Sequence, residues 1–160
     1  PQKEAAEAQQ PKNEATEGEG KVEIIEPVVR PAFVSASVAK TPCFGKCPAF
    51  KITFDATGVA TYVGKKHVKK LGKWTASISG KEYTAILSEA QKIGYFSKPK
   101  TYPPNGKFIA DLPFTITNLH FGQDKHQIRN NVDAPNDLIA YEDFLIELGE
   151  SLKWTKVNDQ

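Results

Sequence analysis

Strands are predicted in the first half of the chain by an alternation of apolar and polar residues. In 34–39 and again in 50–55, the apolar residues recur at every second position, which is typical of a strand with one buried face. The segment 55–58, Asp-Ala-Thr-Gly, predicts a turn because its final glycine can take a positive φ. Residues 59–63 then return as the partner strand, and 73–78 follow as a fourth strand.

Two helices are predicted from apolar residues that recur at three- and four-residue spacing. Ser79 and Glu82 form a capping-box pattern at the start of the first helix, and Gly94 is suited to end it. Asp133-Ala134-Pro135 opens the second helix. The apolar faces consist of Tyr83, Ile86, Leu87, Ala90 and Ile93 in the first helix and of Leu138, Tyr141, Leu145, Leu148 and Leu152 in the second.

A second hairpin is predicted between these helices, from 113–121 and 125–132 around 122–124. The element order is therefore β-β-β-β-α-β-β-α, in which short connections favour antiparallel pairing. Two amphipathic helices need a sheet face to cover. The sequence thus predicts an α+β fold, a two-layer sandwich of a mostly antiparallel sheet with two helices on one face.

His120 and His126 flank this second hairpin, and the length of its loop decides whether they meet. A loop of three residues makes them face each other. A loop of two residues sets Phe121 opposite His126 and Leu119 opposite Ile128. The second register buries more apolar area, so we expect no metal pair here.

The N-terminal 33 residues differ in composition from the rest. Four basic and seven acidic side chains give them a net charge of −3, and the chain total of +2 leaves +5 on residues 34–160. Residues 1–21 lack aromatic and branched aliphatic side chains, so we expect a disordered acidic tail. An extended connector follows, and its four aliphatic residues could contact a partner protein: Ile24, Ile25, Val28 and Val29. We expect one domain over 34–155 and a short C-terminal tail over 156–160.

Composition narrows the class of protein. A chain of 160 residues with 39% hydrophobic and 25% charged residues is typical of one globular domain. No apolar run approaches the roughly 20 residues of a membrane-spanning helix. The chain starts at Pro1 and contains no methionine, from which we expect that a tag, an initiator methionine or a signal peptide was removed.

The most distinctive motif is Thr-Pro-Cys-Phe-Gly-Lys-Cys-Pro at residues 41–48. Cys43 and Cys47 can close a small ring if the backbone bends at Gly45, and a structural disulfide in an oxidising compartment is the favoured interpretation. A redox thiol pair and a metal site remain open as alternatives. The spacing is one residue longer than in a thioredoxin motif and a strand follows it, while only three scattered histidines could complete a metal site.

This motif and the segments after it resemble a bacterial domain family of unknown function that opens with T-P-C-[FY]-G-x-C-P. The similarity continues through Phe50–Phe54, Tyr62–Lys65, Gly94-Tyr95-Phe96, Asp111-Leu112-Pro113 and Ala134-Pro135, and covers about residues 36–154. The resemblance implies a Cys43–Cys47 pair and a location in the periplasm or at the outer membrane. It also makes a lipid anchor upstream of Pro1 conceivable. It implies no established activity.

Two further segments are candidate binding sites. One is a lysine-rich run that could bind an anion such as a phosphate, a lipid headgroup or a polysaccharide, although a lysine-protected sheet edge is the favoured interpretation; its lysines are Lys65, Lys66, Lys69, Lys70 and Lys73. The other is the Pro-rich loop 97–110, in which Tyr102 and Phe108 could form a contact surface or fold back as a lid.

The sequence carries no Gly-rich phosphate loop, no Ser-His-Asp order and no paired-carboxylate signature, and it implies no cofactor. Aromatic residues are not interleaved with the lysines, which disfavours nucleic acid as a partner. The favoured function is therefore a non-enzymatic envelope protein that binds another protein, as an accessory subunit of a membrane-associated assembly. The alternatives are a redox or metal-responsive protein using Cys43 and Cys47, or a module that binds anions or glycans.

Overall fold

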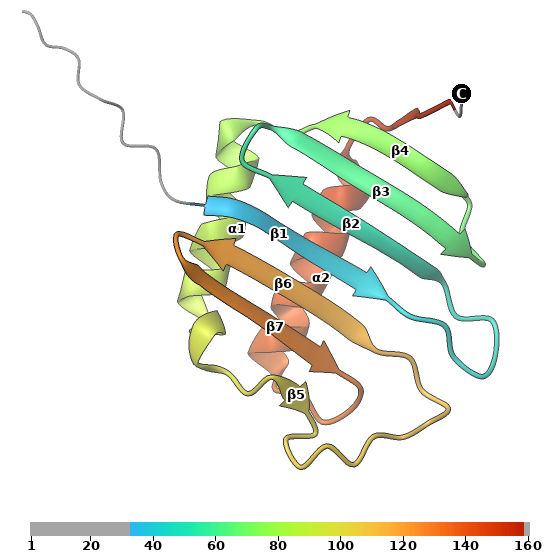
Figure 1. Cartoon of the computed structure of the whole chain (residues 1–160), viewed down its shortest axis with the longest axis vertical. Helices are drawn as coiled ribbons and strands as arrows, with labels where there is room; N and C mark the ends of the chain where they lie inside the picture. The colour runs from blue at the N-terminus through green and yellow to red at the C-terminus, as the bar shows by residue number, and fades with distance from the viewer. Residues whose placement is uncertain (1–32, 159–160) are drawn as a thin grey trace, which may run out of the picture. The chain divides into compact units, whose positions relative to one another are not determined.

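The computed structural model describes residues 33–158. Their strands form one sheet in the order β5-β7-β6-β1-β2-β3-β4-β8, and both α-helices lie behind it in Figure 1. The strands are β1 (Phe33–Lys40), β2 (Ala49–Asp55), β3 (Val59–Lys66), β4 (Gly72–Ser77), β5 (Thr101–Tyr102), β6 (Thr115–Phe121), β7 (Asp124–Asn130) and β8 (Thr155–Lys156). The helices are α1 (Gly80–Lys92), the short 3₁₀ helix η2 (Tyr95–Ser97) and α2 (Asn136–Ser151). The predicted two-layer α+β fold is confirmed.

Pairing in the sheet is antiparallel except where β5 lies parallel to β7. The alternation in β2 buries Ile52 and Phe54 and leaves Lys51 exposed, as a strand with one covered face requires. The Asp55–Gly58 turn joins β2 to β3, and Gly58 has a φ of 92°. The predicted first hairpin is therefore confirmed.

The uncovered face of the sheet carries one uncharged polar row that crosses seven strands. Ser37 lies opposite Thr53 on β2 and opposite Asn118 on β6. The residues paired with these on the outer strands extend the row in both directions. From β7 to β8 the row consists of Gln127, Asn118, Ser37, Thr53, Thr61, Thr75 and Thr155. The Asn118 amide donates to the Ser37 hydroxyl at 3.3 Å. Hydroxyl and amide side chains thus occupy the middle of this face.

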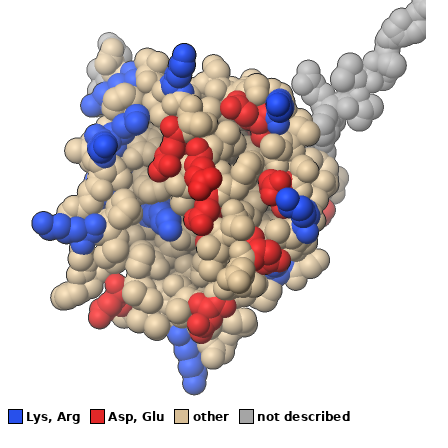
Figure 2. Space-filling view, turned by 180° about the vertical axis from the view of Figure 1, so that it is seen from behind, with Lys and Arg blue, Asp and Glu red and all other residues tan. Residues whose placement is uncertain are grey.

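Both helices cover the opposite face. In α1 the Ser79 Oγ accepts from the Glu82 N–H at 3.1 Å while Glu82 Oε1 accepts from the Ser79 N–H at 2.8 Å, so the predicted capping box is present. In α2 the buried positions include Leu138, Tyr141 and Leu145, as the spacing predicts. The outer side of the molecule seen in Figure 2 shows acidic side chains over its middle and Lys and Arg mostly toward its edges. The exposed acids of α2 are Asp137, Asp143, Glu147 and Glu150.

One acidic residue of α2 lies inside the interface between helix and sheet. Glu142 is only 4% exposed, and both its carboxylate oxygens accept from the Asn130 Nδ2 at 3.0 Å. Burial raises the pKa of Glu142 to about 7, although the Asn130 hydrogen bond and the charge of Lys40 both lower it. The pKa of this carboxyl group therefore lies near neutral pH.

The second hairpin follows neither predicted register. Its turn has two residues, Gly122 and Gln123. Leu119 lies opposite His126, whereas Ile128 was the expected partner, so the register predicted for a two-residue loop is wrong by two positions. His120 lies opposite Lys125 and does not face His126. The imidazole Nε2 of His126 is instead 2.8 Å from the Lys98 carbonyl oxygen. The His126 ring also contacts the ring of the buried Tyr95 edge-on, with 5.6 Å between the two ring centroids.

Candidate interaction site at the disulfide loop

The loop between β1 and β2 is closed by a disulfide between Cys43 and Cys47, whose Cα atoms are 5.6 Å apart. The Gly45 N–H points back at the Cys43 Sγ at 3.2 Å. A ring this small has no interior that could bury a side chain. Phe44 therefore points outward and is 85% exposed, the largest exposed fraction among the large apolar residues of the described chain.

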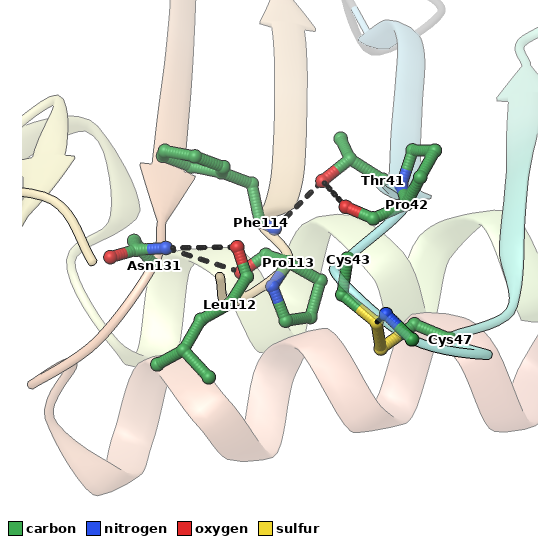
Figure 3. The surroundings of a disulfide bond; sticks show 9 residues. Thr41, Pro42, Cys43, Cys47, Leu112, Pro113, Phe114 and Asn131 are labelled. Atoms are coloured by element: carbon green, nitrogen blue, oxygen red, sulfur yellow. Dashed lines mark hydrogen bonds between the residues drawn. A yellow bond between two sulfur atoms is a disulfide. The ribbon is translucent and has the colours of Figure 1, made fainter. Parts of the chain in front are cut away.

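A second loop, residues 105–113, is held against the end of β7 by Asn131. The Asn131 Oδ1 accepts from the Ile109 N–H at 2.6 Å, and its Nδ2 donates to the carbonyl oxygens of Ile109 at 3.2 Å and of Leu112 at 3.4 Å. Figure 3 shows the amide of Asn131 reaching this loop, while the Leu112 side chain points away from it. One amide thus satisfies several backbone groups and shapes the loop.

Hydrogen bonds from backbone N–H groups join the two loops. The Phe44 N–H donates to the Asp111 carbonyl oxygen at 3.2 Å, and the Phe114 N–H donates to the Thr41 Oγ1 at 2.8 Å (Figure 3). Both loops extend from the same end of the sheet in Figure 1. Their exposed apolar residues are Phe44, Phe108, Ile109 and Leu112, exposed by 85%, 37%, 47% and 39%. We call these four residues the tip surface.

The charges around the tip surface are mixed. The guanidinium of Arg129 lies over the rings of Phe108 at 5.4 Å and Phe114 at 4.5 Å, which braces Phe108 from beneath. Lys46 is exposed in the first loop, and Lys107 and Asp111 are exposed in the second. Within these two loops, two charged side chains are therefore basic and one is acidic.

The predicted contact residues of the Pro-rich loop separate in the structure. Tyr102 is 6% exposed and belongs to the core, and its carbonyl oxygen accepts from the Asn131 N–H at 2.9 Å. It is therefore not available as a contact residue, whereas Phe108 is part of the tip surface. The predicted connector contacts Ile24, Ile25, Val28 and Val29 lie outside the described residues. Sequence reasoning missed Phe44, Ile109 and Leu112, because isolated apolar residues in loops carry no period.

The predicted lysine run also separates. Lys65 and Lys66 end β3, Lys73 belongs to β4, and all three are exposed. Lys69 and Lys70 lie in the connection between these strands, beside a hollow on the helix-covered side of the sheet. The run is therefore no single site: two of its lysines border a cavity and three do not.

The described part of the chain has two oxidised cysteines, and it has neither a cluster of metal-ligating side chains nor a membrane-spanning helix. Both cysteines are oxidised, and residues 33–158 contain no group of three or more His, Cys, Asp or Glu side chains arranged to hold a metal ion. None of the helices described here is long and apolar enough to cross a membrane. The end of the sheet that carries the two loops presents the exposed apolar residues of the tip surface.

Removing the disulfide is expected to loosen the tip surface more than the fold. For Cys43→Ser combined with Cys47→Ser we expect a loss of about 2 kcal/mol in unfolding free energy, because so small a ring restricts few unfolded conformations. Urea denaturation measures this loss, and hydrogen exchange at the Phe44 amide reports the loop. Lys46→Ser, inside the intact ring, is the control. Equal protection of the Phe44 amide in native and double-variant protein would contradict the idea that the bridge shapes this loop.

Comparison with known proteins adds a family but no activity. None of the curated proteins matches this chain. The family model described as a domain of unknown function, DUF6438, matches residues 34–149, which run from β1 into the last turns of α2 and include both cysteines. The match covers most of the chain, and the chain therefore belongs to the DUF6438 family of domains of unknown function.

Proposed function

We propose that this domain is a non-enzymatic module of the bacterial cell envelope that binds another protein through the tip surface. One observation carries the proposal: Phe44 is 85% exposed on a loop that a disulfide holds in place. An aromatic side chain in water at the end of a rigid loop has no role in the fold. Aromatic residues are enriched among those that dominate binding energy at protein interfaces.

The rigidity of the tip surface favours binding. The disulfide holds one loop, Asn131 holds the other, and the Phe44–Asp111 hydrogen bond joins them. Association then costs little ordering entropy, because the loops have one shape before the partner arrives. Lys46 and Lys107 beside the apolar residues favour a partner whose apolar patch is flanked by acidic side chains.

A protein suits this surface better than a lipid bilayer. Asp111 lies between Ile109 and Leu112 in the same loop, and its side chain is exposed. Inserting the tip surface into hydrocarbon would carry this carboxylate toward a medium that cannot solvate it. A protein partner can instead supply a donor for it. The exposed acid thus favours a protein interface.

The envelope location is part of the same proposal. Disulfides persist in oxidising compartments such as the bacterial periplasm, and the Cys43–Cys47 bridge supports such a location. The periplasm or the outer membrane, with or without a lipid anchor upstream of Pro1, fits this location. We propose that the aliphatic residues of the connector, Ile24, Ile25, Val28 and Val29, add contacts to the same partner.

Site-specific photo-crosslinking in the intact envelope tests the proposal. A photoreactive residue at position 44 is expected to form an adduct with a partner protein, and Phe44→Ser with Leu112→Ser should abolish capture of that partner. Val59, 40% exposed beside the β2–β3 turn at the other end of the sheet, gives the matched control position and the control variant Val59→Thr. Deleting residues 1–31, which leaves β1 intact, should weaken the capture.

Three outcomes would contradict the proposal. Adducts with lipid alone at position 44 would indicate a membrane surface. Equal adducts at positions 44 and 59 would indicate unspecific contact. Capture that survives Phe44→Ser with Leu112→Ser would place the interface elsewhere on the domain.

A further inference from the structure

A hollow of about 520 Å³ opens on the helix-covered side of the sheet, and Pro48, the residue that follows Cys47, is among its lining residues. Three parts of the chain enclose it: the sheet at β1–β3, the last turns of α2 with Trp154 beyond them, and residues 67–70 between β3 and β4. Neither Phe44 nor Leu112 lines it. The volume lies in the range of small-molecule sites, about 300–1,000 Å³.

Aromatic rings form one side of the hollow. Phe50 stacks on Tyr62 with ring centroids 5.8 Å apart, and Tyr62 contacts Trp154 at 5.7 Å. The indole N–H of Trp154 donates to the Gly149 carbonyl oxygen at 2.8 Å, which fixes the plane of its ring. Burial raises the pKa of Tyr62, so its hydroxyl stays neutral. These rings offer an apolar surface that is already oriented, with the Trp154 ring tilted by 52° against that of Tyr62.

Two glycines shape the walls. A Cβ on Gly64 would overlap the carbonyl oxygen of Lys70, so the β3–β4 connection folds directly onto β3 where no side chain stands. A Cβ on Gly149 would lie 2.5 Å from the Cδ1 of Ile52, so α2 approaches the sheet closely at its last turn. The hollow therefore depends on two close backbone approaches rather than on a gap left by poor packing.

Cations border this apolar surface. Lys40, Lys69 and Lys70 all line the hollow, with His67 beside them and Glu150 as the one acid among the lining residues. The Lys70 ammonium lies 6.0 Å from the ring centroid of Trp74, whose indole N–H donates to the Leu71 carbonyl oxygen at 2.9 Å. The Lys40 charge also acts on the buried Glu142, whereas none of the described salt bridges pairs Lys69 or Lys70 with a carboxylate.

We propose that this hollow binds a small amphipathic anion, with its carboxylate or phosphate group at Lys69 and Lys70 and its apolar body against Phe50, Tyr62 and Trp154. The shared chemistry is one anionic group on an alkyl or aromatic body of pocket size. An apolar surface with a few convergent charged groups is the usual composition of a ligand pocket. The ammonium groups of Lys69 and Lys70 have no carboxylate partner among the described salt bridges. The anion would replace the water around these two groups.

Two carboxylate probes and their neutral counterparts test this proposal. Decanoate represents an alkyl body and 2-naphthoate an aromatic one, and decanol and 2-naphthol lack the charge. Titrations followed by amide chemical shifts are expected to show at least one carboxylate binding, with shifts at Gly64, Gly149 and the Trp154 indole. Binding should weaken with added salt because it relies on exposed charges.

The lysine run supplies matched variants. Lys69→Gln with Lys70→Gln should lower the affinity for the bound carboxylate about tenfold, whereas Lys65→Gln with Lys66→Gln should change it less than about twofold. Both pairs remove two charges from the same segment, but only the first borders the hollow. Phe44→Ser should leave the affinity unchanged, which keeps this test separate from that of the tip surface.

Three results would overturn the proposal. An equal loss in both lysine pairs would mean unspecific attraction to a basic segment. Neutral probes that bind as tightly as the carboxylates would mean a purely apolar hollow. Titration without shifts at Gly149 and Trp154 would mean that the hollow stays empty.

Discussion

Gly64→Ala is expected to destabilise the domain by about 3 kcal/mol, at the upper end of the usual cost of inserting a methyl group into a packed site. The new methyl group would overlap the carbonyl oxygen of Lys70, which belongs to the backbone and cannot turn aside like a side chain. The connection 66–71 must then lift off β3, which also opens the hollow. Urea denaturation measures the stability, and the amide shifts of Lys69 and Lys70 report the displacement.

Gly80→Ala is the matched control for this substitution. A Cβ at Gly80 meets no atom within 4 Å, and the residue begins α1. Alanine there should leave stability unchanged or raise it by up to about 1 kcal/mol, because alanine loses less conformational freedom than glycine when a helix forms. Equal stabilities of the two variants would contradict the close approach of Lys70 to β3.

Raising the pH from about 4.5 to about 7 is expected to destabilise the domain by about 3 kcal/mol through Glu142. Burial raises the pKa of this carboxyl group from its ordinary value of 4.5 to about 7 in the folded protein. Between these two values the unfolded chain releases the proton and the folded protein keeps it. Stability is therefore greatest below about pH 4.5 and falls as the pH rises through about 7.

Glu142→Gln isolates this effect. Glutamine keeps the size of the side chain and an oxygen that accepts from Asn130, but it has no charge to bury. We expect the variant to be more stable than the native protein at about pH 8 and to lose most of the slope between pH 5 and about pH 8. The charged groups that act on Glu142 are Lys40 and Asp143, and both remain in the variant.

Glu147→Gln provides the control, since Glu147 is exposed on the same helix. Thermal or urea unfolding at several pH values should show the same slope in this control as in the native protein. A slope that survives Glu142→Gln would assign the pH dependence to another group.

The sheet and helices were predictable because each one follows a local rule. The alternation in 50–55 needs only a covered and an open face, and the capping box needs only Ser79 and Glu82 three residues apart. The two-residue strands β5 and β8 were not predictable, because such short segments show no period. The register of the second hairpin was missed because two apolar patterns two residues apart bury the same face.

The candidate sites depend on contacts that the sequence does not display. Asn131 shapes a loop some 20 residues before it, and Gly64 accommodates a carbonyl group of the next connection. The exposure of Phe44 was open to inference, since a disulfide ring with a sequence separation of four encloses no space. The lysine run looked uniform in the sequence, and only the fold of 67–70 distinguishes its members.

The polar row across the open face of the sheet determines how that face meets water. Threonine is β-branched and favours the extended backbone, yet its hydroxyl group remains hydrated. Thr53, Thr61 and Thr75 thus supply strand propensity at the centre of the sheet without forming a continuous exposed apolar surface. A wide sheet can in this way have helices on one side alone, because most side chains along the row on its other side can form hydrogen bonds with water.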